Sequence, residues 1–71
     1  MDVGRWTLAN PDLGLWVRMV SNGSLAACWV LPDDKLWKWG TIINSLNNVE
    51  KTRELAMFLA DLEIGLRFNI K

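Results

Sequence analysis

The chain has 71 residues, a formal net charge of zero at pH 7 and no histidine, and 51% of its residues are hydrophobic. A chain of this length makes a single domain. Zero net charge argues against binding to duplex nucleic acid or to an anionic membrane surface. The lack of histidine removes the commonest general base and the commonest transition-metal ligand. A domain this small buries only about 60% of the surface that its unfolded chain exposes. Some apolar surface should therefore stay exposed to solvent, and exposed apolar patches usually mark interaction sites.

The first half of the chain predicts three short strands. Residues 4–10 are expected to form a first strand that ends in an Asn-Pro-Asp turn. Residues 13–20 and 25–31 are apolar runs rich in β-branched and aromatic residues, with an Asn-Gly pair at 22–23 between them. That dipeptide is the strongest short-range signal of a hairpin, because both residues tolerate the positive φ of a type I′ turn.

The register of this hairpin decides which side chains share a face. A two-residue loop places Trp16 opposite Trp29, and because strand side chains alternate, Arg18 lies on the same face as these two rings. The opposite face is the better candidate for the core, and it carries Leu15, Val17, Met19, Ala26, Cys28 and Val30.

Residues 35–43 follow a Pro-Asp-Asp break and fit either a strand or a helix. As a strand after a four-residue loop, they extend the sheet to a meander and place Lys38 opposite Trp29. As a helix, they would hold Gly40 in the interior, which costs about 1 kcal/mol relative to alanine. The strand is therefore favoured.

A helix is expected over residues 49–64, with Asn47 as N-cap and Glu50 three residues later in a capping-box arrangement. Gly65 supplies the C-terminal cap. The stripe expected to pack on the sheet has helical spacing and consists of Leu55, Phe58, Leu59 and Leu62.

Residues 66–71 alternate apolar and polar side chains, which is typical of a half-buried strand. The whole chain, residues 1–71, is thus predicted to be one small α+β domain of order β-β-β-β-α-β, with the helix packed on one face of an antiparallel meander.

Chemistry-bearing residues are scarce. Cys28 is the only cysteine, so no internal disulfide can form, and its place in a strand predicts a buried structural thiol. One cysteine without histidine leaves no zinc site, and no serine or glycine pattern matches a nucleophile elbow or a phosphate-binding loop. The sequence predicts a non-enzyme without cofactor or metal.

The N-terminus lacks the pattern of a secretory signal. The longest apolar stretch, residues 55–60, is too short to cross a bilayer. We therefore expect a cytoplasmic protein with no membrane partner.

Five tryptophans are many for this length, and tryptophan is enriched at binding hot spots. The hypothesis we favour is a protein-binding module of adaptor or inhibitor type, a kind common among phage and mobile-element products, that also forms a homodimer. The face expected to bind carries Trp16, Arg18, Trp29 and Lys38, with Arg18 or Lys38 stacked on an indole.

Two alternatives stay open. Aromatic side chains interleaved with Arg and Lys can stack the bases of single-stranded nucleic acid, although zero net charge weighs against this. An indole-lined pocket could instead hold a small molecule.

Overall fold

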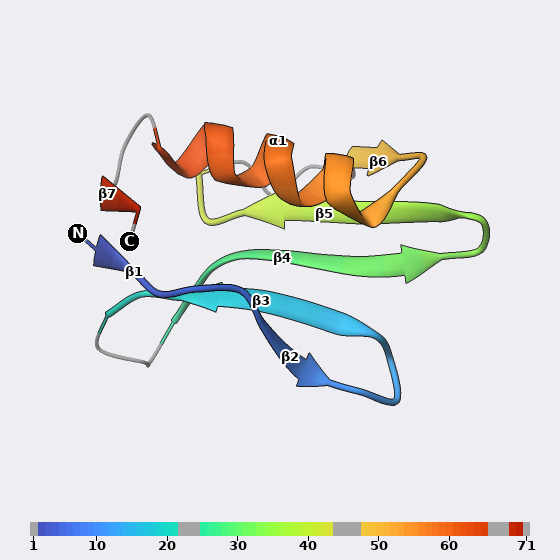
Figure 1. Cartoon of the computed structure of the whole chain (residues 1–71), viewed down its shortest axis with the longest axis horizontal. Helices are drawn as coiled ribbons and strands as arrows, with labels where there is room; N and C mark the ends of the chain where they lie inside the picture. The colour runs from blue at the N-terminus through green and yellow to red at the C-terminus, as the bar shows by residue number, and fades with distance from the viewer. Residues whose placement is uncertain (1, 22–24, 44–47, 66–68, 71) are drawn as a thin grey trace.

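In the computed structural model, which describes residues 2–21, 25–43, 48–65 and 69–70, one helix packs against an antiparallel sheet. The predicted α+β class is confirmed (Figure 1). The sheet has five strands in sequence order, and these are β2 (Thr7–Asn10), β3 (Leu15–Met19), β4 (Ala26–Asp33), β5 (Leu36–Thr41) and β6 (Asn48–Glu50).

The remaining elements close the fold at one end. The helix α1 spans Arg53–Gly65, and the short strand β1 (Asp2–Val3) pairs in parallel with β7 (Asn69–Ile70). Figure 1 shows β1 and β7 together near the two chain ends, while α1 runs along β5 and β6. An isolated bridge from Val3 to Val20 connects the N-terminal strand to the end of β3.

A β-bulge in β4 changes the predicted hairpin register. Next to the turn the register is the expected one, since the Val20 amide donates to the Leu25 carbonyl at 2.8 Å. Farther along, Arg18 pairs with Cys28, so Ala27 has no partner across the ladder. An extra residue on one strand moves all later positions by one, and a shift of one exchanges the two faces of a strand. The Asn-Gly turn itself lies outside the described residues.

The predicted pairing of Trp16 with Trp29 is therefore wrong. Trp16 pairs with Val30, and Trp29 pairs with Val17. The two indoles project from opposite faces of the sheet, because directly paired residues share a face and neighbouring positions alternate.

The strand interpretation of residues 35–43 is confirmed by β5, but its loop is shorter than expected. Asp33 pairs with Leu36, which leaves a two-residue turn, and Asp34 adopts the left-handed conformation there with φ of 59°. Lys38 pairs with Leu31 and not with Trp29, a shift of two positions that keeps its predicted face. Pro32 stays within β4 because it lies beyond the last pair of β3 with β4.

The helix begins four residues later than predicted. Thr52 acts as its N-cap, with Oγ1 accepting a hydrogen bond from the Leu55 amide at 3.1 Å. The expected capping box with Asn47 and Glu50 is wrong: Asn47 is outside the described residues, and Glu50 belongs to β6, where its carboxylate accepts a hydrogen bond from Trp39 Nε1 at 3.2 Å. Pairing with β5 overrides the local helix signal.

The helix also packs through a different face from the one predicted. Ala56, Ala60 and Ile64 are fully buried against the sheet, and Leu59 is partly buried beside them. The other members of the predicted stripe, Leu55, Phe58 and Leu62, are 41%, 60% and 55% exposed. Alanine at every fourth position lets the helix backbone approach the sheet closely, so the larger side chains are left outside.

Candidate interaction surfaces

The two faces of the sheet differ in what covers them. The side toward α1, called here the helix side, holds the buried side chains of Cys28, Val30 and Trp39. The opposite side is called here the open face, since the described helix packs on the other side. By alternation from the strand registers, the open face carries Leu15, Val17, Met19, Trp29, Leu31, Asp33, Leu36, Lys38, Gly40 and Val49.

The four residues expected to form one binding surface are divided between these faces. Trp29 and Lys38 share the open face, whereas Trp16 and Arg18 point to the helix side. The single surface is not formed, because the bulge at Ala27 exchanges the faces of β4 relative to β3. That these residues bind a partner stays a prediction.

The Trp29 indole covers Gly40 on the open face. A Cβ at position 40 would be 2.5 Å from Trp29 Cζ2 and 2.8 Å from Cε2, so the ring occupies the space that a side chain there would need. Val17 and Gly40, the two residues paired with Trp29, are both buried, and the indole itself is half-buried. The ring is thereby packed against the sheet at Gly40.

The open face also carries exposed apolar side chains and one balanced pair of charges. Leu36 and Val49 are 40% and 43% exposed. Lys38 Nζ lies 3.7 Å from Asp33 Oδ2, and the two side chains are 36% and 55% exposed. A pair this exposed contributes about 0–1 kcal/mol to stability, so both charges remain available to a partner.

On the helix side, a cation is held between two indoles. The guanidinium carbon of Arg53 lies 5.0 Å from the ring centre of Trp16 and 6.0 Å from that of Trp37. Cation–π contacts of this length attract the first turn of α1 to β3 and β5. The sequence analysis expected Arg18 or Lys38 to stack on an indole. Nothing in the sequence around Arg53 indicated that its guanidinium would contact Trp16 and Trp37.

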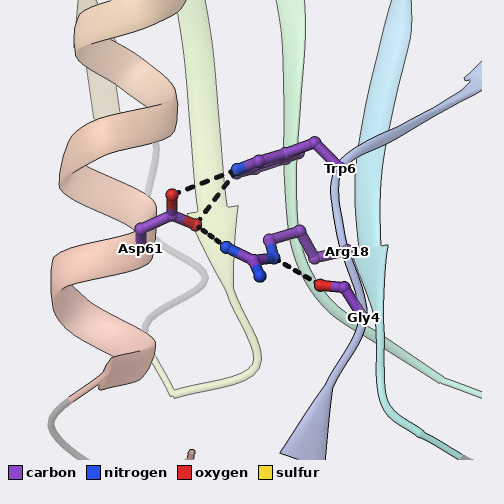
Figure 2. Close-up of polar contacts among 4 residues, drawn as sticks. All are labelled: Gly4, Trp6, Arg18 and Asp61. Carbon is purple, nitrogen blue, oxygen red and sulfur yellow. Dashed lines mark hydrogen bonds and ion pairs between the residues drawn. The ribbon is translucent and has the colours of Figure 1, made fainter. Parts of the chain in front are cut away.

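A polar network joins three distant segments beneath the helix (Figure 2). Asp61 accepts hydrogen bonds from Arg18 Nη1 at 2.8 Å and from Trp6 Nε1 at 3.1 Å, and Arg18 Nε donates to the Gly4 carbonyl at 2.6 Å. The Arg18 side chain is only 6% exposed and that of Asp61 is 32% exposed. A buried guanidinium needs such partners, so these contacts serve the fold.

Cys28 lies next to this network and is fully buried, as predicted. Burial raises the pKa of its thiol from 9.0 to about 12, and the Asp61 carboxylate adds to the rise, while Arg18 acts in the opposite direction. A thiol that stays protonated at neutral pH is a poor nucleophile. Over the described residues there is also no group of three or more Cys, Asp or Glu side chains placed to bind a metal ion.

A third surface lies on the outside of α1. We call Leu55, Phe58 and Leu62 the outer stripe; they are among the exposed large apolar side chains of the chain. Glu54 and Glu63 lie on either side of it along the helix. The side of α1 opposite the outer stripe carries Ala56 and Ala60, at positions i and i+4. This pair of small residues was the sequence signal that could have predicted which side packs on the sheet.

Comparison with protein-family models, with curated proteins and with solved structures finds no match for this chain. The helix of the described part is too short and too polar to cross a membrane.

Proposed function

We propose that this chain is a non-catalytic protein-interaction module, of adaptor or inhibitor type, that forms a homodimer through the open face. The observation that carries this proposal is a five-stranded sheet whose helix packs on one side, while Trp29, Leu36 and Val49 lie on the other with part of their apolar surface in water. Exposed apolar side chains gathered on an uncovered sheet face are typical of interaction sites.

The charges of the open face support a second copy as its partner. In a two-fold dimer the same surface meets itself, so its charges must be self-complementary. Asp33 and Lys38 are 3.7 Å apart. A two-fold axis that lies in the plane of the interface and runs between these two side chains brings the lysine of each copy toward the aspartate of its partner. A face with a single sign of charge would repel itself instead.

The dimer should be a weak one. A standard interface buries about 800 Å² per partner, which is about one sixth of the 4623 Å² accessible surface of this chain. Five strands spaced about 4.8 Å apart make the open face roughly 20 Å wide, so it can supply an interface at the lower end of the range. We expect a dissociation constant on the order of micromolar.

The test is sedimentation velocity over about 1–200 μM protein, a range that brackets a micromolar dissociation constant. Leu36→Lys should weaken dimerisation at least about tenfold, since it places a charge in the apolar part of the face. Leu13→Lys is the matched control, because Leu13 is 57% exposed in the β2–β3 turn and belongs to none of the five strands whose side chains make the open face. It should leave the dimer unchanged.

A charge exchange tests the two-fold arrangement. Lys38→Glu should weaken the dimer, since carboxylates then meet carboxylates, and Asp33→Lys combined with Lys38→Glu should restore it. A chain that stays monomeric over the whole range, or an equal effect of Leu13→Lys and Leu36→Lys, would overturn the proposal.

A further inference from the structure

We propose that Trp16 and Trp37 form a binding site for a trimethylammonium group, and that Arg53 of the same chain competes with the ligand for this site. The inference stands on three features of the helix side: two indoles that share one cation, the exposure of that cation and of the surface beside it, and the carboxylates next to it.

The strand pairing brings the two indoles to the same part of the helix side. Trp16 of β3 pairs with Val30 of β4. Trp37 of β5 pairs with Pro32, two residues farther along β4. Because directly paired residues share a face, and alternate residues of a strand do too, both tryptophans and Pro32 lie on one side of the sheet. The first turn of α1 adds Arg53 on that side.

The two rings share a single positive charge. The guanidinium carbon of Arg53 lies 5.0 Å from the ring centre of Trp16 and 6.0 Å from that of Trp37. The face of an aromatic ring attracts a cation within about 6 Å of its centre, and indole does so more strongly than the other aromatic side chains. Several aromatic rings around one cation are the arrangement that recognises quaternary ammonium ligands.

The site is open to solvent. The Arg53 side chain is 40% exposed, both indoles are half-buried, and Pro32 is exposed. A Cβ on Gly14 would lie 3.1 Å from Pro32 Cγ, so a side chain at position 14 would cover the proline. With glycine there, the ring of Pro32 is left as an apolar surface that the methyl groups of a ligand can contact.

Arg53 is held by weak contacts, so a ligand can displace it. Its Nη2 lies 3.4 Å from Glu54 Oε2, in an ion pair whose side chains are 40% and 75% exposed. Ion pairs and cation–π contacts this exposed stabilise a structure only slightly. A trimethylammonium group has no N–H donor that must find an acceptor, so it leaves water for the two indoles more easily than a guanidinium does.

The charges beside the rings favour a cation over a nucleic acid. Glu50 pairs with Trp37 and therefore shares its face, where the carboxylate accepts a hydrogen bond from Trp39 Nε1 at 3.2 Å. Glu54 lies next to the guanidinium itself. These carboxylates attract an organic cation, whereas they repel the phosphates of a strand that would stack its bases on the same indoles.

The experiment titrates ¹⁵N-labelled protein with choline, with a trimethyllysine peptide and with the neutral tert-butyl analogue of choline, in which carbon replaces nitrogen. The indole N–H signals of Trp16 and Trp37 should shift, while that of Trp29 on the open face should not. Choline should bind at least about fivefold more tightly than its neutral analogue. Binding of either trimethylammonium ligand supports the proposal, and the tighter of the two identifies whether the source is a small molecule or a modified side chain.

Variants test the competition by Arg53. Arg53→Ala should tighten choline binding about tenfold, because a competitor that fills a site about nine-tenths of the time lowers the apparent affinity about tenfold. Lys51→Ala is the matched control, since it removes the same charge from an exposed residue just before the helix. It should leave the affinity within about twofold of the wild type. Trp37→Leu should weaken binding at least about tenfold, and Trp37→Phe replaces it if the leucine variant fails to fold.

The proposal fails on any of three results. These are equal binding of choline and its neutral analogue, equal effects of Arg53→Ala and Lys51→Ala, and unshifted Trp16 and Trp37 signals in Arg53→Ala with choline at about 50 mM, well above a millimolar dissociation constant. Because the site lies on the helix side, none of these results depends on whether the open face forms a homodimer.

Discussion

At the scale of single residues, the contact of Trp29 with Gly40 makes a sharp prediction. Gly40→Ala places a methyl group where Trp29 Cζ2 now lies 2.5 Å away. The ring must move, and we expect the free energy of unfolding to fall by about 1–3 kcal/mol, with a change in tryptophan fluorescence. Urea denaturation followed by fluorescence measures both.

Gly4→Ala is the control for this substitution, because the nearest atom to its Cβ is the Met19 carbonyl oxygen at 3.8 Å. It should change the free energy of unfolding by less than about 0.5 kcal/mol. Trp29→Val should remove most of the penalty of Gly40→Ala when the two are combined. Equal costs for Gly4→Ala and Gly40→Ala would contradict a close contact of the ring with the sheet.

Cys28 predicts how stability depends on alkaline pH. Its pKa is raised from 9.0 to about 12 in the folded protein, so the folded state holds a proton that the unfolded state releases above pH 9. Stability from this group is therefore complete below pH 9 and falls as the pH rises toward 12. Urea denaturation from pH 7 to 11 should give a steeper decline for the wild type than for Cys28→Ala. Equal slopes would show that the thiol is not protected by burial.

At the scale of elements, local patterns predicted the strands but not their exact pairing. The apolar runs at 13–20 and 25–31 did form β3 and β4. The bulge at Ala27 has a contact outside the hairpin: the Ala27 carbonyl accepts a hydrogen bond at 2.9 Å from the amide of Ile42, the residue that directly follows β5. The hairpin prediction uses only the two paired strands and their turn, so it takes no account of contacts with a third strand. It therefore placed Trp16 and Trp29 on one face.

The helix shows the same limit in another form. The apolar periodicity predicted that α1 exists. It also predicted that the largest apolar side chains, such as Phe58 and Leu62, would lie in the core. Packing selected Ala56 and Ala60, because small side chains allow the close approach that buries the strand residues Cys28 and Val30. The excess of apolar surface was therefore predicted from composition, whereas its division between the open face and the outer stripe required the structure.

At the scale of the whole molecule, aromatic residues are used mostly for the fold. Trp6 donates to Asp61, Trp39 donates to Glu50, and Trp16 and Trp37 hold Arg53. Trp29 alone among the five points to the open face. The stacked platform on which the single-stranded nucleic acid hypothesis depended therefore lacks its second ring, while a protein contact needs only one anchor beside Leu36 and Val49.

The contacts of Arg18 with Asp61 and with Gly4 join the N-terminal segment, β3 and α1, and their contribution to stability can be tested directly. Asp61→Ala leaves a guanidinium that is 6% exposed without its carboxylate. Breaking a buried pair costs about 3–5 kcal/mol, and because Asp61 is 32% exposed we expect the lower part of that range. Glu63→Ala, two residues along the same helix, should cost less than about 0.5 kcal/mol.

Asp61→Asn separates charge from hydrogen bonding in this network. The amide can still accept from Trp6, so a cost close to that of Asp61→Ala would show that the charge on Arg18 is the dominant contribution. Arg18→Met with Asp61→Leu should recover much of the lost stability, since an apolar pair of similar volume avoids burying a charge. Chemical denaturation of these variants, together with Arg18→Met alone and Asp61→Leu alone, measures all of this, and additive effects of these two single substitutions would contradict a direct ion pair.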